Sequence, residues 1–222
     1  MRAPRALALG LCGLLLALAC SDSRSHARAT VVLVDVSGTY ADQRGEVVRI
    51  IRTGLLPRVR PGDSFFLIRI GEQSYDRSAV EAAETLDAQP SRANAQKLVL
   101  AGKLDRFAKS SLRARHTDIS GAILLASEYL RETRAGRRDI IIFSDLREEL
   151  PKGVRRSLEP GELKGTDVVA MNVKRLAADA NDPSSYRARL ADWGARLTSA
   201  GASSWKVVLE PEELAEQFAA ER

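Results

Sequence analysis

Three short segments of the chain carry side chains whose oxygen atoms could bind a metal ion. They are Asp35-Val36-Ser37-Gly38-Thr39, His116-Thr117-Asp118 and Ser144-Asp145. Carboxylate and hydroxyl oxygens are hard ligands that suit Mg²⁺, Mn²⁺ or Ca²⁺, and none of the three segments offers a thiolate. Asp35, Ser37 and Thr39 alternate along the chain, so a backbone that turns after a strand can direct all three at one point, and Gly38 permits the tight turn. The sequence therefore predicts a divalent-metal site, with Mg²⁺ as the favoured ion.

The first and third segments directly follow short apolar runs that are typical of buried strands. Thr30–Val36 is rich in β-branched residues and apolar on both faces, and Asp139–Ser144 contains three consecutive isoleucines. Further strands are expected at Ser64–Ile70, Asp167–Val173 and Ser203–Leu209. Helices are expected over Glu46–Leu56, Ser91–Ala114, Asp118–Thr133, Pro183–Ala200 and Pro211–Arg222. The pattern of Ser74–Asp87 fits neither element clearly.

Strands and helices alternate through residues 29–222, which predicts one α/β domain. Its central sheet should be doubly wound and mainly parallel, with helices on both faces in a Rossmann-like arrangement. In such folds ligands bind beyond the carboxyl ends of the strands. We therefore expect the three oxygen-bearing segments to meet at one edge of the sheet.

The order and spacing of these residues resemble the metal-ion-dependent adhesion site of von Willebrand factor A domains. The resemblance rests on Asp35-x-Ser37-x-Thr39, a lone Thr117 before a helix, and Asp145 after an apolar strand, and it covers the chain from about Thr30 onward. It implies that the three hydroxyls are ligands, direct or exchanging, and that the two carboxylates hold the ion mostly through water and hydrogen bonds. It also implies an open coordination position that an acidic residue of a protein partner fills, which is the chemistry of a binding module and not of an enzyme.

The chain departs from the family pattern near several of these residues. Thr39 replaces the commoner serine, Leu146 follows Asp145 where glycine is frequent, and Arg115 and His116 precede Thr117 where small residues are common. Arg115 is a candidate competitor of the metal. We expect Asp118 to be a helix cap rather than a ligand, His116 to lie at the margin of the site, and Glu148 and Glu149 to form a solvated loop.

The N-terminus has the features of a bacterial lipoprotein signal. Met1–Arg5 is basic, Ala6–Ala19 is an apolar run too short to span a bilayer, and Cys20 follows it directly. We expect residues 1–19 to be removed, Cys20 to be lipidated, and residues 20–28 to be a polar tether. Ser21, in place of aspartate, favours the outer over the inner membrane, so the chain is expected to be an envelope protein.

The amino-acid composition bears on the class of protein and on its partners. Of 222 residues 45% are hydrophobic and 28% are charged, which is typical of a globular domain, and the net charge of +5 comes without a basic run containing aromatics, so nucleic acid is not an expected partner. Two other functions remain open. Asp35-Val36-Ser37-Gly38-Thr39 resembles the Asp-x-Asp-Gly-Thr start of haloacid-dehalogenase-type phosphatases, although Ser37 replaces the acid that donates a proton there. The second open function is that of a von Willebrand factor A scaffold that has lost its metal and binds partners through its surface alone.

Overall fold

The computed structural model describes residues 26–38, 40–171 and 182–220, and the expected signal peptide, Cys20, most of the tether and Thr39 lie outside these residues. The described residues form one six-stranded sheet in the order β3-β2-β1-β4-β5-β6, in which every neighbouring pair is parallel except β2 and β3. The strands are β1 (Arg28–Asp35), β2 (Ser64–Ile70), β3 (Val80–Thr85), β4 (Arg137–Phe143), β5 (Thr166–Met171) and β6 (Ser204–Val208). The predicted doubly wound, mainly parallel α/β fold is confirmed.

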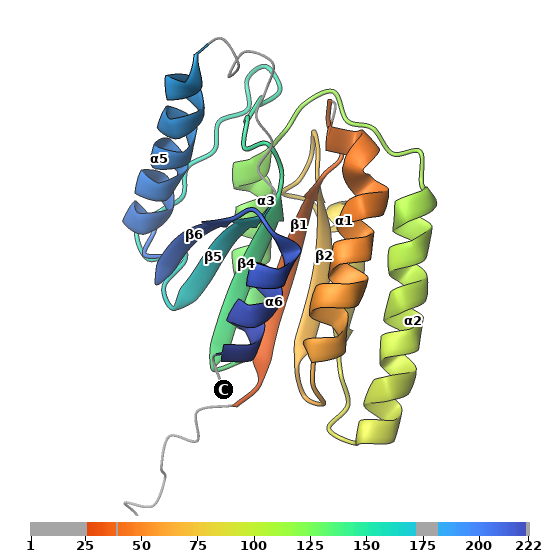
Figure 1. Ribbon diagram of the computed structural model, residues 1–222. Coiled ribbons are helices and arrows are strands. Elements are labelled where there is room, and N and C mark those ends of the chain that lie inside the picture. The colour runs from red at the N-terminus through yellow and green to blue at the C-terminus, as the bar shows by residue number, and fades with distance from the viewer. Residues whose placement is uncertain (1–25, 39, 172–181, 221–222) are drawn as a thin grey trace, which may run out of the picture.

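Helices cover both faces of this sheet (Figure 1). The helices α1 (Arg44–Ile50), α2 (Pro90–Lys109) and α6 (Pro211–Ala220) lie on one face, and α3 (Ile119–Glu132) and α5 (Pro183–Ser199) lie on the other. Side chains alternate along β1, so Val32 and Val34 belong to the first core while Val31 and Leu33 belong to the second. This is why β1 is apolar on both faces, and burial between two helical layers fixes the position of its carboxyl end.

Three elements differ from the sequence predictions. The first predicted helix continues past α1 as a π-helical turn (Ile51–Leu55) and a 3₁₀ turn (Leu56–Arg58). The ambiguous segment forms a 3₁₀ turn (Arg77–Ala79) followed by β3, the antiparallel edge strand. The helix expected to reach Ala114 ends at Lys109, because Ala114 instead donates its N–H to the carbonyl of Val36 at 2.8 Å.

The alternation of strands and helices fails between β4 and β5. Residues 144–165 are all described and contain no helix. Pro151 and Pro160 disfavour a continuous helix there, and Gly153, Gly161 and Gly165 adopt positive φ angles of 84°, 89° and 74°. The expectation of alternation was therefore wrong for this connection, which runs from the carboxyl end of β4 back to the amino end of β5 as an irregular segment.

Candidate metal centre

Asp35 ends β1 and lies at the centre of the predicted site. Asp35 is 1% exposed, and both of its carboxylate oxygens accept hydrogen bonds. Oδ1 accepts from the N–H of Ser37 at 2.8 Å and from the Ser37 hydroxyl at 2.6 Å, while Oδ2 accepts from the Ser144 hydroxyl at 2.6 Å. The adjacent strands β1 and β4 pair up to Val34 and Phe143, so the residues that follow meet at the same height. The carboxylate thus links the first and third predicted segments.

Ser37 and Thr117 come from distant parts of the chain but their hydroxyl oxygens lie 2.6 Å apart. The Ser37 hydroxyl has one hydrogen, and Asp35 accepts it. The hydrogen between the two hydroxyls is then supplied by Thr117, which leaves both lone pairs of Thr117 Oγ1 without a donor among the described contacts. Asp35 therefore orders the hydroxyl hydrogens so that lone pairs remain for a cation.

Backbone hydrogen bonds hold Thr117 in this position. Its N–H donates to the carbonyl of Glu149 at 2.8 Å, and the Glu149 N–H donates back to its carbonyl at 3.0 Å. On either side, Ala114 is bonded to Val36 beyond β1, and Asp118 donates its N–H to the carbonyl of Gly71 beyond β2 at 2.9 Å. The segment before α3 is thus fixed to the ends of β1 and β2 and to the loop after β4.

Asp145 is partly buried in that loop. Its Oδ1 accepts the N–H of Arg147 at 2.8 Å. Leu146 has φ of 63°, the left-handed conformation that glycine adopts more easily. The side chain of Leu146 is 1% exposed, and Trp193 of α5 donates its indole N–H to the Leu146 carbonyl at 2.9 Å. Burial and this bond offset the cost of the strained backbone.

The two carboxylates are held in surroundings that disfavour negative charge. Burial raises the pKa of Asp35 from 3.8 to about 6, and the charge of Asp145 adds to the rise, whereas the bonds from Ser144 and Ser37 oppose it. Burial also raises the pKa of Asp145, against the backbone bond from Arg147 and the charges of Arg189 and Arg147. No described Lys or Arg side chain forms an ion pair with Asp35. A cation at this edge would offset the cost of the buried charge.

The donor set fits a hard divalent cation. Among the described residues there is no group of three or more His, Cys, Asp or Glu side chains suited to a metal ion. The oxygens available are those of two carboxylates and of the Ser37 and Thr117 hydroxyls, and the structure brings Asp35, Ser37 and Thr117 into direct contact. Oxygen ligands of low total charge suit Mg²⁺, Mn²⁺ or Ca²⁺ better than soft ions.

An arginine does lie beside the candidate site, but it is Arg113 and not Arg115. The Arg113 guanidinium donates to the carbonyl of Gly38 at 3.0 Å and forms an ion pair with Asp42. Arg115 is exposed, and its N–H donates to Glu72 Oε1 at 2.9 Å. The sequence pattern could not distinguish the two, because the partners of Arg113 lie more than 70 residues away along the chain.

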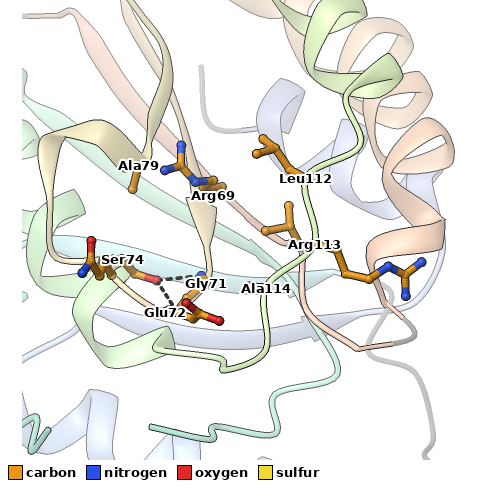
Figure 2. A pocket seen from close by; sticks show the side chains of 10 residues that line it. Arg69, Gly71, Glu72, Ser74, Ala79, Leu112, Arg113 and Ala114 are labelled. Carbon is orange, nitrogen blue, oxygen red and sulfur yellow. Dashed lines mark hydrogen bonds between the residues drawn. The ribbon is translucent and has the colours of Figure 1, made fainter. Parts of the chain in front are cut away.

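A cleft of about 270 Å³ opens next to the candidate site, between the turn after β2 and the segment before α3 (Figure 2). Arg69, Glu72, Ser74, Leu112 and Arg113 are among the residues that line it, and Ser74 Oγ accepts the N–H of Gly71 at 2.8 Å. Ala114 also lines it and forms a β-bridge with Ser37. The cleft is therefore continuous with the first predicted segment.

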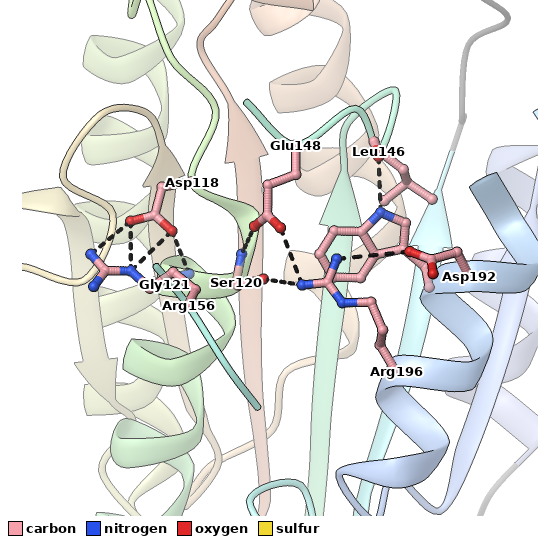
Figure 3. A network of polar contacts seen from close by, with 9 residues as sticks. Asp118, Ser120, Gly121, Leu146, Glu148, Arg156, Asp192 and Arg196 are labelled. Atoms are coloured by element: carbon pink, nitrogen blue, oxygen red, sulfur yellow. Dashed lines mark hydrogen bonds and ion pairs between the residues drawn. The ribbon is translucent and has the colours of Figure 1, made fainter. Parts of the chain in front are cut away.

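Asp118 caps α3, as the sequence predicts. Its Oδ1 accepts the N–H of Gly121 at 2.7 Å, and the residue is completely buried. Arg156, from the irregular β4–β5 connection, donates to both of its oxygens, with Nη2 2.9 Å from Oδ2 (Figure 3). Arg156 stood in no recognisable pattern, so the partner of Asp118 could not be found from sequence.

Glu148 is not part of a solvated loop, whereas Glu149 is exposed. Glu148 Oε1 accepts the N–H of Ser120 at 2.7 Å, and Oε2 lies 3.1 Å from Arg196 of α5 (Figure 3). The guanidinium of Arg196 also lies over the Trp193 ring, 4.0 Å from its centroid. The prediction that Glu148 is solvated was wrong, because its carboxylate accepts the N–H of Ser120 at the start of α3, where the helix itself offers no acceptor. The loop that carries Asp145 is thereby tied to both α3 and α5.

No helix within the described residues is long and apolar enough to cross a membrane. The lipid anchor and the location of the chain therefore stay predictions. At the candidate site, His116 is partly buried and directly precedes Thr117.

Comparison with known proteins gives structural likeness but no sequence match. No protein-family model matches the chain, and no curated protein sequence does. A mutant of the PilB minor pilin from Streptococcus sanguinis is 10% identical with a TM-score of 0.52, over 88% of this chain and 60% of the pilin. BatB from Bacteroides thetaiotaomicron is 15% identical with a TM-score of 0.51, over 87% of this chain and 98% of BatB.

A structure described as von Willebrand factor type A from Catenulispora acidiphila is 13% identical with a TM-score of 0.48, over 88% of this chain and 42% of that one. The chain thus spans most of BatB but only part of the other two proteins. At these identities the likeness concerns the fold alone. The chain shares a mainly parallel α/β fold with the PilB minor pilin and BatB, which is the kind of fold that the resemblance to von Willebrand factor A domains predicts.

Proposed function

We propose that this chain is a lipid-anchored envelope protein whose domain binds a protein partner through a divalent metal ion. Asp35, Ser37, Thr39, Thr117 and Asp145 would hold the ion. The observation that carries the proposal is the buried contact of Asp35, Ser37 and Thr117, in which the carboxylate accepts the serine hydrogen and the two hydroxyl oxygens lie 2.6 Å apart. Burial makes the negative charge of Asp35 costly, as the raised pKa of this carboxyl indicates, and a bound cation would offset that cost.

A bound Mg²⁺ would supply an electrophilic centre with room for one further oxygen ligand. Few carboxylates are available to neutralise it, so an acidic side chain of a partner would be a favourable additional ligand. The proposed partner is therefore a protein that offers an aspartate or glutamate.

The arrangement favours binding over catalysis. A phosphatase of the resembled kind needs the Asp35 carboxylate as a nucleophile, but both of its oxygens accept hydrogen bonds and the residue is 1% exposed. The position of the proton-donating acid is held by Ser37. We therefore propose a non-enzymatic module.

Calorimetric titration of Mg²⁺, Mn²⁺ and Ca²⁺ into residues 21–222 tests the metal site, since this segment contains every residue of both described cores. The wild type should bind one ion, and Asp145→Asn should weaken binding at least tenfold. Asp167→Asn is the matched control, because Asp167 is also partly buried but pairs with Ser204 at the start of β5. A folded wild type without saturable binding would leave the metal-free scaffold as the better account.

The proposed anchor needs a separate test, because residues 1–25 are not described. The support is the apolar run that ends at Cys20 and the polar segment after it. The full chain, expressed in a bacterium with two membranes and fed labelled palmitate, should carry the label and sediment with outer-membrane fractions. Cys20→Ser should lose the label, and a labelled Cys20→Ser chain would refute lipidation at this residue.

A further inference from the structure

Tyr40 places a polar atom in the otherwise apolar core beneath the candidate metal centre. The residue is 2% exposed and belongs to the core that includes Val36 and Val47. Its hydroxyl is buried and has no hydrogen-bond partner among the described residues. An unpaired buried hydroxyl costs free energy, whereas phenylalanine would fill the same volume without that cost. The hydroxyl therefore lacks a partner that the described residues could supply, and a bound molecule or ion-held water would satisfy it.

The position of Tyr40 indicates what that partner is. It directly follows the Asp35–Thr39 segment, and Ala41 donates its N–H to the carbonyl of Ser37 at 3.1 Å, so the turn of the predicted site places Tyr40 beside it. Both Asp35 and Asp145 act electrostatically on its phenol. Burial, together with these two charges, raises the pKa of Tyr40, so the phenol keeps its hydrogen.

We propose that the Tyr40 hydroxyl forms a hydrogen bond with a water molecule bound to the metal ion, and so belongs to the outer shell of the site. This inference rests on the proposed function. A neutral phenol can both donate toward the carboxylates and accept from water, so it can orient a bound water without adding charge. Groups that bond to a metal's ligands in this way contribute substantially to affinity. Tyr40 is a positioning residue here, since it would act through water.

Three measurements on Tyr40→Phe, with Tyr129→Phe as control, test the proposal. Tyr129 is a partly buried tyrosine of α3 that packs against Phe66, 5.0 Å between ring centroids. Mg²⁺ titration should show roughly tenfold weaker binding by Tyr40→Phe and no change for the control. In chelator, Tyr40→Phe should be at least as stable as the wild type in urea. The near-ultraviolet difference spectrum on adding Mg²⁺ should lose its tyrosine component only in Tyr40→Phe.

The outcomes separate this inference from the proposed function. If the wild type binds Mg²⁺ and Tyr40→Phe binds it equally tightly, the inference is overturned while the metal site stands. Tyr40→Phe that is less stable than the wild type in chelator, with unchanged affinity, would show that the hydroxyl bonds a permanent water unrelated to the ion, which also overturns it. If the folded wild type binds no ion, the proposed function and the inference both fall.

Discussion

Replacing Asp35 by asparagine should make the ion-free domain relatively more stable as the pH rises, and should remove its stabilisation by Mg²⁺. Burial raises the pKa of Asp35 from 3.8 to about 6. The folded wild type therefore binds more protons than the unfolded chain between these values, so this group's contribution to stability is full below pH 3.8 and is lost as the pH rises through 6. The asparagine variant has no such titration.

The size of this pH effect on stability follows from how far the pKa of Asp35 is raised. A change in pKa from 3.8 to about 6 corresponds to about 3 kcal/mol, most of which falls between pH 4 and pH 8. The difference in unfolding free energy between variant and wild type should thus move by roughly 2 to 3 kcal/mol in favour of the variant over that range. A second effect lowers the stability of the variant by about 1 kcal/mol at every pH. The Ser144 hydroxyl donates to Asp35 Oδ2 in the wild type, whereas in the variant it must accept a hydrogen bond from the asparagine amide.

Urea unfolding in chelator at a series of pH values measures this difference. At pH 7.5 the same experiment with Mg²⁺ at a hundredfold excess over its dissociation constant should stabilise the wild type by about 2.7 kcal/mol and the variant by much less. Asp167→Asn serves as control and should gain from Mg²⁺ as the wild type does. A difference between Asp35→Asn and wild type that is independent of pH would refute the electrostatic reasoning, and equal stabilisation of both by Mg²⁺ would refute the metal assignment.

Two further variants test the start of α3, which positions Thr117. Gly121→Ala should destabilise the domain by about 2 kcal/mol, because the added methyl group would overlap the Asp118 carboxylate. Gly102→Ala in α2 is the control and should stabilise the domain by about 0.5 kcal/mol, because its methyl group meets only the end of a flexible arginine. Equal urea midpoints for the two variants would contradict this prediction. Arg156→Gln leaves the buried Asp118 charge unpaired and should cost about 3 kcal/mol in urea unfolding, while Arg155→Gln, which is exposed, should cost little. A loss under 1 kcal/mol for Arg156→Gln would show that water replaces the guanidinium.

Five of the six described strands, and the meeting of the polar residues that follow β1 and β4, could be predicted because each depends on a local pattern. The apolar runs at β1 and β4 are buried on both faces, and the polar residues after them must meet because parallel strands end at one edge. Thr117 could be added only through the family resemblance, since a single threonine before a helix has no periodic signal. The structure brings Ser37 and Thr117 into contact, and their role as metal ligands stays a prediction.

The features that sequence could not predict depend on long-range partners. α2 ends at Lys109 because Arg44 donates to the carbonyls of Ser110 and Leu112, and because Ala114 donates its N–H to Val36. Arg156 lies in a connection rich in turn-forming residues, and only the fold shows that it pairs with Asp118. β3 was ambiguous because an edge strand has only one neighbour, and its residues Val80–Thr85 alternate imperfectly between buried and exposed.

A crystal structure with Mn²⁺, located by its anomalous scattering, would show directly whether these hydroxyls hold a metal ion. We expect one peak at the carboxyl edge of the sheet, about 2.2 Å from Ser37 Oγ and Thr117 Oγ1. Adjacent ligands of an octahedral ion at that distance are about 3 Å apart, so the separation of these two oxygens should increase from 2.6 Å. A saturated crystal with no peak there, and with the two hydroxyls still bonded to each other, would exclude this metal site.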